Sequence, residues 1–169
     1  FLQHTATHRL HAAFVLAATT GMRRGEIAGL KWADLDEGAS RLAVRRSLVT
    51  SGYEVVWSDP KTERSRRNIA LDPATLAALR AHRARQAREK LALGPAYKDQ
   101  DLVFAREDGR SMHPERLSKL FALSVRDANL PRIRFHDLRH THATLALQAG
   151  VHPKIVSERL GHGEDAGRF

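Results

Sequence analysis

The sequence predicts a single α+β domain that is mainly helical and carries a small three-stranded antiparallel sheet. Apolar residues recur at helical spacing in several separate stretches of the chain. Three shorter runs that suit β-strands lie together in the first half, separated by turn residues. The length of 169 residues suits one domain with a core of ordinary size.

The helices are expected where apolar positions repeat between capping and breaking residues. Leu10, Phe14 and Val15 predict a buried first helix, which Gly21 interrupts. Asp72 followed by Pro73 places a capping residue and then a proline at the first helical position of a long helix. The predicted helices cover residues 8–20, 23–30, 73–93, 114–129, 135–149 and 153–160.

The strands are expected in the runs Leu42–Val49, Tyr53–Trp57 and Arg67–Leu71. Ser51-Gly52 and the polar residues 58–65 separate these runs, which is typical of an antiparallel meander. A short extended piece is expected later, at 102–104.

The composition narrows the range of functions that the chain could have. Lys and Arg number 28 against 19 Asp and Glu, giving a formal charge of +9, and the chain has no cysteine. The absence of cysteine excludes a disulfide scaffold, a thiolate metal site and a cysteine nucleophile. The sequence has no signal peptide pattern and no apolar stretch long enough to span a membrane, so we expect a cytoplasmic protein without a membrane partner. The basic balance favours a polyanion such as nucleic acid, with solubility as the alternative.

The segment from His136 to His142 carries the most informative motif. His136 and Arg139 are three positions apart, so they share a face of a helix. An imidazole beside a guanidinium suits a phosphodiester under attack, because the guanidinium holds the non-bridging oxygens while the imidazole moves a proton. An exposed polar face is the alternative, and a lone His-x-x-Arg pair by itself favours it. The spacing of His136 and His140 also allows a metal site, but the carboxylate of a zinc-protease motif is absent.

The stretch from Thr19 to Ile27 is the second candidate. Gly21 permits a sharp turn between two helices, and Arg23 then lies near a helix N-terminus, where phosphate is favoured. Glu26, three residues after Arg23, is placed to hold that arginine. The alternative is a helix cap with an ordinary surface ion pair.

The polar residues between the second and third predicted strands form the third candidate. Residues 60–67 contain four cations and one carboxylate, which suits contact with a nucleic-acid backbone. Lys61 is also able to donate a proton to a leaving alkoxide. A solvated hairpin tip is the alternative. The fourth candidate is His162, directly after the helix-ending pair Leu160-Gly161.

The order of these motifs is more specific than any one of them. The chain has Thr20–Glu26, then Lys61 ahead of Ser65–Arg67, then His136–His140 and finally Leu160–His162. This order resembles the catalytic domain of the tyrosine recombinases, the family of the phage integrases, from about residue 10 to residue 162. The resemblance implies strand cleavage and rejoining in double-stranded DNA through a 3′-phosphotyrosine, which needs neither a metal nor another cofactor.

The resemblance also implies roles for individual residues. Arg23 and Arg139 correspond to the two arginines that clamp the scissile phosphate. Lys61 is similar to the lysine that protonates the leaving 5′-oxygen, and His136 to the general acid or base. His162 resembles the later histidine that hydrogen-bonds the phosphate. Supporting positions fall on Glu26 and His140, and contacts to the DNA backbone are expected from Arg24, Arg64, Arg66 and Arg67. We expect the Arg139 and Lys61 side chains to face the DNA, so their removal should leave folding largely intact.

The chain departs from the family pattern at the nucleophile. The family tyrosine follows the Leu-Gly-His histidine by about nine residues, near position 171, whereas this chain ends at Phe169. Tyr53 and Tyr97 do not match that place. We therefore expect one catalytic domain over 1–169, incomplete at its C-terminus, without the N-terminal core-binding domain and inactive in cis. A tetramer on DNA is expected of the full-length parent. The alternatives are an inactive DNA-binding relative and a histidine-based metalloenzyme.

Overall fold

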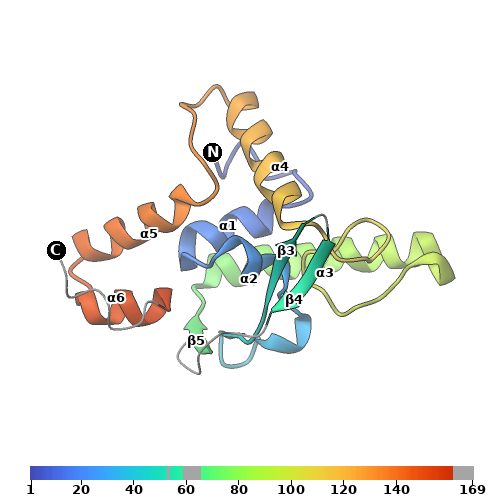
Figure 1. Ribbon diagram of the computed structural model, residues 1–169, viewed down its shortest axis with the longest axis horizontal. Coiled ribbons are helices and arrows are strands. Elements are labelled where there is room, and N and C mark those ends of the chain that lie inside the picture. Colours follow the sequence, from blue (N-terminus) through green and yellow to red (C-terminus); the bar gives the residue numbers. More distant parts are fainter. Residues whose placement is uncertain (53, 59–65, 162–169) are drawn as a thin grey trace.

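The computed structural model describes residues 1–52, 54–58 and 66–161, and these residues form a mainly helical domain with small antiparallel sheets (Figure 1). The helices are α1 (His11–Thr20), α2 (Arg24–Ala28), α3 (Pro73–Leu93), α4 (Pro114–Asp127), α5 (Asp137–Gln148) and α6 (Pro153–Leu160), with short 3-10 helices η1 (Trp32–Asp34) and η3 (Gly94–Ala96). The strands are β1 (Leu35–Asp36), β2 (Arg41–Val44), β3 (Ser47–Ser51), β4 (Glu54–Ser58) and β5 (Arg67–Ala70). The predicted α+β class is confirmed, and each predicted helix exists.

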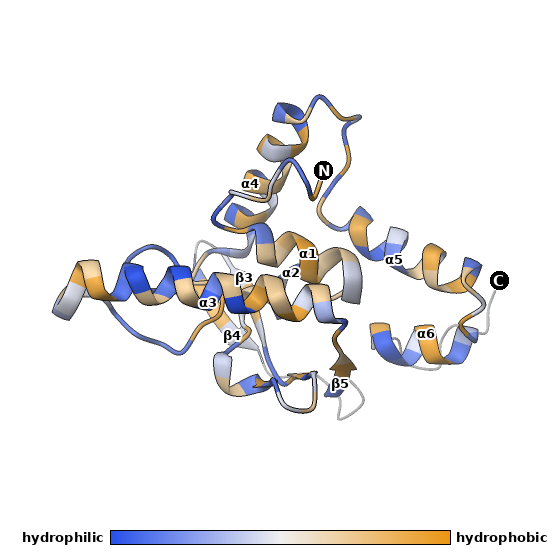
Figure 2. Ribbon diagram, turned by 180° about the vertical axis from the view of Figure 1, so that it is seen from behind, coloured by the Kyte–Doolittle hydropathy of each residue, from blue (hydrophilic) through white to orange (hydrophobic). Residues whose placement is uncertain are grey.

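Helix α1 lies at the centre of the domain and is buried on all sides. Residues 12 to 17 are all buried, so the helix is apolar around its circumference rather than along one stripe (Figure 2). Phe14 and Phe121 pack edge to face with ring centroids 5.6 Å apart, which joins α1 to α4. Helices α3 and α5 also pack on α1. Helix α2 also contacts α1, so the two helices that carry predicted site residues, α2 and α5, are both anchored on this core helix.

The long helix α3 starts where its sequence signals predicted. Asp72 caps it by accepting a hydrogen bond from the Thr75 amide at 2.9 Å, and Pro73 occupies the first turn. Farther along, the buried Gln86 side chain accepts a hydrogen bond from Trp32 Nε1 at 2.7 Å and donates one to the Leu102 carbonyl at 2.9 Å. These bonds fix η1 and the extended piece at 102–104 against the helix.

The sheets differ from the predicted single meander. β1, β2 and β5 form an antiparallel three-stranded sheet, whereas β3 and β4 form a separate two-stranded ribbon. The run predicted as one strand over 42–49 is thus two strands, broken at Arg45 and Arg46. The physical reason is the buried Asp34 carboxylate, which pairs with the Arg46 guanidinium and lies 3.8 Å from Arg45 Nε, so the chain turns around these charges.

The ribbon packs on α2, and small residues permit the close approach. A Cβ atom on Gly25 would lie 2.4 Å from Ser47 Oγ and 2.5 Å from the Leu48 carbonyl oxygen. Figure 1 shows α5 and α6 on one side of the molecule, while the C-terminal end of α3 extends to the opposite side. Among the described residues, no helix is both long enough and apolar enough to cross a bilayer.

Candidate functional site

The C-terminal end of α6 accepts hydrogen bonds from three arginines that come from three different parts of the chain. The last carbonyls of a helix have no partner within the helix and carry its negative partial charge, so guanidinium groups stabilise them. The bonds run from Arg67 Nε to the Arg159 oxygen (2.7 Å), from Arg139 Nη2 to the Leu160 oxygen (2.7 Å) and from Arg23 Nη2 to the Gly161 oxygen (3.3 Å). Consecutive carbonyls thereby gather Arg23, Arg67 and Arg139 at one place.

Glu26 is the carboxylate of this cluster. Its oxygens accept hydrogen bonds from Arg67 Nη1 and Nη2, both at 2.9 Å, and from the Arg23 backbone amide at 2.8 Å. Arg23 Nη1 adds an ion pair at 3.2 Å. Burial raises the pKa of Glu26, but the hydrogen bonds and charges of Arg67 and Arg23 outweigh it, so the pKa lies below its ordinary value. The Glu26 side chain therefore holds Arg23 as the spacing in the sequence predicted.

Arg139 lies beneath the surface rather than on it. The residue is 5% exposed, and its Nη1 donates to the Gly21 carbonyl at 2.7 Å. Burial, and then the charge of Arg23, lower the pKa of Arg139 to about 10, so the side chain stays charged at neutral pH. We expected an exposed side chain at this position, whereas the structure places it inside the protein. The reason is that α5 packs its Arg139 face onto α1 and α6, where the polar partners of the side chain include backbone carbonyls.

Gly21 provides the room for this packing. The residue has a φ of +64°, and a Cβ atom there would lie 2.6 Å from Leu160 Cδ2 and 3.0 Å from His142 Cδ2. His142 is itself buried, and its Nε2 has no hydrogen-bond partner among the described residues. Burial, and then the charge of Arg159, lower the pKa of His142. The sequence indicated a turn at Gly21 but not that α6 and His142 press against it.

His136 and His140 stand together at the start of α5. Both are exposed, and their ring centroids lie 5.0 Å apart. Partial burial lowers the pKa of His136, and the positive charges of His140 and Arg139 lower it further. His136 is the exposed residue that precedes the first turn of α5, and its side chain makes no capping hydrogen bond, while Arg139 is buried one turn later. The two side chains therefore do not share one exposed face, although they remain electrostatically coupled.

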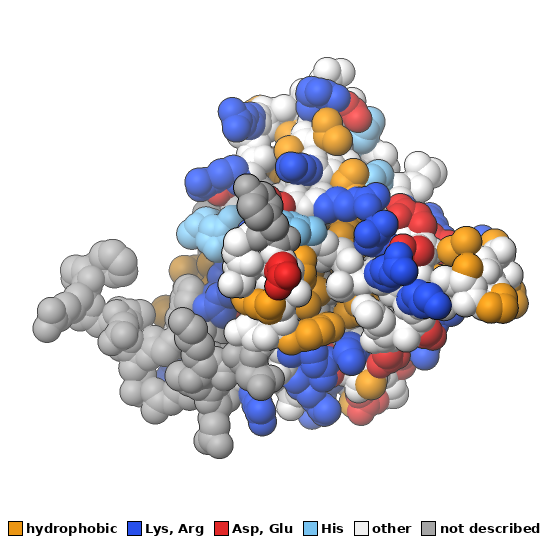
Figure 3. Space-filling view, turned by 45° about the vertical axis from the view of Figure 1, so that its right-hand side comes forward, with side chains coloured by type: hydrophobic (Ala, Val, Ile, Leu, Met, Phe, Trp, Pro, Cys, Tyr) orange, Lys and Arg blue, Asp and Glu red, His pale blue; other side chains and the backbone are white. Residues whose placement is uncertain are grey.

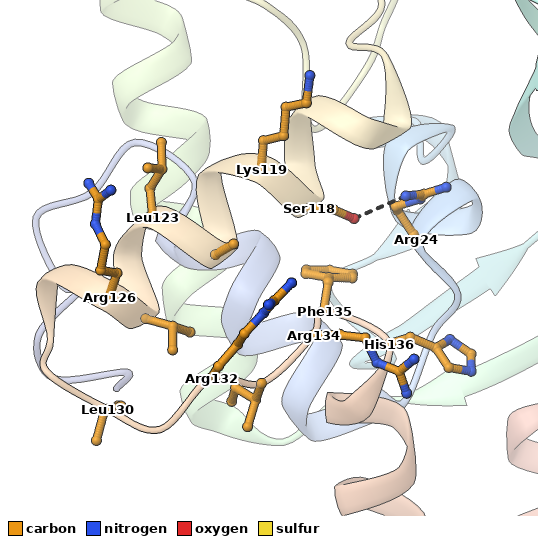
Figure 4. A pocket seen from close by; sticks show the side chains of 13 residues that line it. Arg24, Ser118, Lys119, Leu123, Arg126, Leu130, Arg132, Arg134, Phe135 and His136 are labelled. Carbon is orange, nitrogen blue, oxygen red and sulfur yellow. Dashed lines mark hydrogen bonds between the residues drawn. The ribbon is translucent and has the colours of Figure 1, made fainter.

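A groove of about 560 Å³ places Arg23 and His136 on a common surface. Its walls come from the start of α2, from β3 and from the start of α4, and its lining includes Arg24 and Ser118. Arg24 Nη1 donates to Ser118 Oγ at 3.1 Å, which orients this arginine across the groove (Figure 4). Nothing in the sequence singled out Ser118, because a serine in an amphipathic helix has no distinctive signal.

A second, more apolar groove of about 890 Å³ adjoins the first between α4 and residues 130–136. Figure 4 shows Phe135 on the segment that follows α4, with Arg132 and Arg134 on the same segment. Lys and Arg side chains are widespread on the face shown in Figure 3, with fewer acidic side chains between them. The lining of the first groove includes Arg23, Arg24 and His136 and no carboxylate, so this part of the described surface is cationic and suited to an anion.

The remaining predicted site residues fall into two groups. Lys61, Arg64 and His162 lie outside the described residues. Arg66 is exposed, as a backbone contact requires. The Arg67 side chain is only 7% exposed and is engaged by Glu26, which argues against the DNA contact expected for it. The sequence could not separate these neighbours, because only the register of β5 decides which arginine turns inward.

The described residues contain no group of three or more His, Asp or Glu side chains placed to hold a metal ion. The site they form consists of guanidinium groups, a carboxylate and imidazoles. Such a set binds and neutralises an anion and moves protons.

The fold and the site define a mainly helical domain in which two arginines far apart in the sequence, Arg23 and Arg139, meet at the C-terminal end of α6. The chain belongs to the phage integrase family, whose family model matches residues 1–166. The resemblance found in the sequence is therefore confirmed.

Two relatives illustrate the match in sequence. A tyrosine recombinase XerC-like protein of Caldanaerobacter subterraneus subsp. tengcongensis is 38% identical over 167 residues, covering 92% of this chain and 43% of that protein. The ICEBs1 integrase of Bacillus subtilis is 31% identical over 152 residues, covering 89% of this chain and 40% of the integrase. The chain thus spans less than half the length of these relatives.

Solved structures show the same fold. The Tn1549 transposon integrase, in a structure with transposon right end DNA, superposes with a TM-score of 0.80 at 24% identity, covering 92% of this chain and 51% of that one. The XerA recombinase gives a TM-score of 0.75 at 24% identity, covering 96% of this chain and 51% of that one.

Proposed function

We propose that this domain is the catalytic part of a site-specific DNA recombinase or integrase, which breaks and rejoins DNA strands through a 3′-phosphotyrosine intermediate. The observation that carries the proposal is the meeting of Arg23 and Arg139 at neighbouring carbonyls, Gly161 and Leu160. Arg23 is 42% exposed at its side chain and lines the groove that also holds His136. A phosphate in this groove meets a guanidinium and an imidazole together.

The chemistry proposed for these groups is phosphoryl transfer without a metal. A tyrosine oxygen attacks phosphorus and forms a P–O bond, the bond to the 5′-oxygen breaks, and a proton must reach the leaving oxygen. Arg23 neutralises charge that grows on the non-bridging oxygens. Arg139 joins it by exchanging the Leu160 carbonyl for a phosphate oxygen. Because the pKa of His136 lies below its ordinary value, the ring is neutral at pH 7 and able to accept the tyrosine proton.

Other roles rest on the family pattern alone. Lys61 is assigned the proton for the leaving 5′-oxygen, and His162 a hydrogen bond to the phosphate. Tyr97 follows η3 at the C-terminal end of α3, which lies on the side of the molecule opposite α5 and α6 (Figure 1), so it is a poor candidate for the nucleophile. Tyr53 does not match the family position either. We therefore place the nucleophile on a tyrosine about nine residues after His162, as in the family.

The proposed partner is double-stranded DNA, which the cationic groove and the formal charge of +9 support. The Tn1549 transposon integrase, which shares the fold, is itself in complex with transposon right end DNA in its solved structure. For the parent of this chain we propose recombination within a homo-tetramer on DNA, in the cytoplasm. No metal or other cofactor is required by the proposed chemistry.

The proposal is tested by extending the chain with a segment that places a tyrosine at the family position. A pool of nicked duplexes with randomised core sequence traps a covalent adduct, because the nick lets the short 5′ strand diffuse away after cleavage. We expect an adduct that survives detergent, whose DNA reveals the target site. The matched control carries Phe in place of that tyrosine. Tight DNA binding without any adduct would overturn the proposal in favour of an inactive DNA-binding relative.

A further inference from the structure

Arg67 differs from the other two arginines of the cluster in pairing with both oxygens of the buried Glu26 carboxylate. Its Nη1 and Nη2 each donate to one Glu26 oxygen at 2.9 Å, and its Nε donates to the Arg159 carbonyl at 2.7 Å. The side chain is 7% exposed. This fork-to-fork geometry is the most specific form of an arginine–carboxylate pair, because both partners are fixed in position and orientation.

Arg23 shares the same carboxylate less completely. Its Nη1 reaches only Glu26 Oε1, at 3.2 Å, and its side chain is 42% exposed. Because Arg67 already occupies both oxygens of Glu26, the carboxylate is largely neutralised from the buried side. Arg23 therefore shares this carboxylate only in part, and its half-exposed side chain lines the groove.

Gly161 gives independent evidence that the position of Arg67 is built into the fold. A Cβ atom on Gly161 would lie 3.0 Å from Arg67 Nη1 and 3.3 Å from its Cζ. The φ of this glycine is +69°, the left-handed conformation in which a helix commonly ends. The guanidinium of Arg67 thus lies directly against the end of α6, where the carbonyls that receive Arg139 and Arg23 are located.

We propose that Arg67 is a positioning residue of the cleavage site: it locks Glu26 to the end of α6 and so keeps the Arg23 guanidinium available to the phosphate, without itself touching DNA. The inference rests on the proposed function. It gives a part in that reaction to Arg67, which is not among the catalytic residues that the family resemblance implies.

Removal of Arg67 has a defined electrostatic consequence. Glu26 is left with Arg23 as its main cationic partner, so Arg23 moves toward the carboxylate and loses part of its effective charge at the groove. Glu26→Gln then relieves the defect, because the amide no longer attracts Arg23 but its oxygen still accepts a hydrogen bond from the Arg23 amide. A purely structural role of Arg67 predicts no such relief, since the second substitution removes a further interaction.

The first test needs no DNA. The ¹⁵N–¹H signal of Arg23 Nε is recorded in the 169-residue chain and in the variants Arg67→Met, Arg67→Lys and Arg67→Met/Glu26→Gln. We expect a clear shift in Arg67→Met, a smaller one in Arg67→Lys, and a return toward the original position in the double variant. Arg41→Met is the matched control, because it removes an exposed arginine from the same sheet. An Arg23 signal that stays in place in folded Arg67→Met or Arg67→Lys overturns the proposal.

The second test uses the tyrosine-extended chain and the trapped target duplex. We expect Arg67→Met to slow adduct formation at saturating DNA by about 100-fold, as misplacement of a catalytic group does, with DNA affinity unchanged. The Glu26→Gln partner restores part of that rate, and Arg41→Met keeps the original rate. Equal rates in Arg67→Met and the unaltered chain would overturn the positioning role of Arg67 but leave the proposed function standing. If the unaltered chain forms no adduct, the proposed function fails, and the Arg23 signal still decides on Arg67.

Discussion

Arg23 and Arg139 donate hydrogen bonds to adjacent carbonyl oxygens at the end of α6, Gly161 at 3.3 Å and Leu160 at 2.7 Å. The carbonyls at the end of α6 thus accept hydrogen bonds that Arg23 and Arg139 would otherwise donate to a phosphate. The helix end carries only partial negative charge, whereas a phosphodiester carries a full one. The two arginines are therefore held close together before any anion binds, and we propose that a phosphate oxygen replaces the Leu160 carbonyl as a partner of Arg139.

Arg139 is expected to stabilise the fold. Arg139→Ala leaves the buried Gly21 and Leu160 carbonyls without this donor, and each buried carbonyl that loses its partner costs about 1–3 kcal/mol. Urea unfolding followed by circular dichroism measures the loss. The exposed Arg132→Ala on the loop before α5 is the control and should unfold as the original chain does. An unchanged midpoint in Arg139→Ala would show that the side chain is not buried in solution.

Gly21 is expected to tolerate no side chain. Gly21→Ala suffers twice, because its φ of +64° is unfavourable for alanine and because the new Cβ would lie 2.6 Å from Leu160 Cδ2. Gly150→Ala has a comparable φ of +79° but open space around it, so it should lose only the conformational cost of about 1–2 kcal/mol. The difference between the two variants in thermal unfolding isolates the contact with α6. Equal losses would mean that α6 does not press on Gly21.

The fold is expected to lose stability as the pH falls below about 6.5, partly through His82. Burial lowers the pKa of His82 even though its Nε2 contacts the Val103 carbonyl at 2.7 Å. The unfolded chain then binds more protons than the folded one, so acid favours unfolding from the ordinary pKa of 6.5 downward. His82→Gln keeps a donor for Val103 but does not titrate. Its free energy of unfolding should decline less than that of the unaltered chain between about pH 7.5 and 5.5. An identical decline in both would show that His82 does not contribute to the pH dependence.

The neighbours Arg66 and Arg67 are expected to differ in DNA binding. Arg66 is exposed, so Arg66→Gln should lower the slope of log affinity against log salt concentration by about 1. Arg67 is held by Glu26, so Arg67→Gln should lower the slope by clearly less than Arg66→Gln does. Fluorescence anisotropy with a labelled duplex at several salt concentrations measures both slopes. A lowered slope for Arg67→Gln alone would reverse the assignment.

Local rules predicted the helices well and the sheet less well. The Asp72–Pro73 start of α3 follows from capping chemistry that involves only neighbouring residues. The break at Arg45 and Arg46 depends on Asp34, which lies eleven and twelve positions earlier and draws the arginines through space. Periodicity contains no information on such a partner, so one run over 42–49 was expected where two strands exist.

The site shows the same division. The pairing of Arg23 with Glu26 follows from their spacing at the start of a helix. The burial of Arg139 and the inward turn of Arg67 depend on α6, whose carbonyls meet both side chains only in the folded chain. Backbone carbonyls have no sequence signature, and this explains why motif order identified the residues but misplaced two of them relative to the surface.

We propose that Arg23 neutralises the phosphate at which the strand is cleaved. A methylphosphonate at that position of the trapped target duplex removes the negative charge that Arg23 would balance. The rate of adduct formation by the tyrosine-extended Arg23→Ala variant is compared on the two duplexes, normalised to the unaltered chain. We expect a severe defect on the ordinary phosphate and a much smaller one on the methylphosphonate. An equally severe defect on both duplexes would contradict the claim.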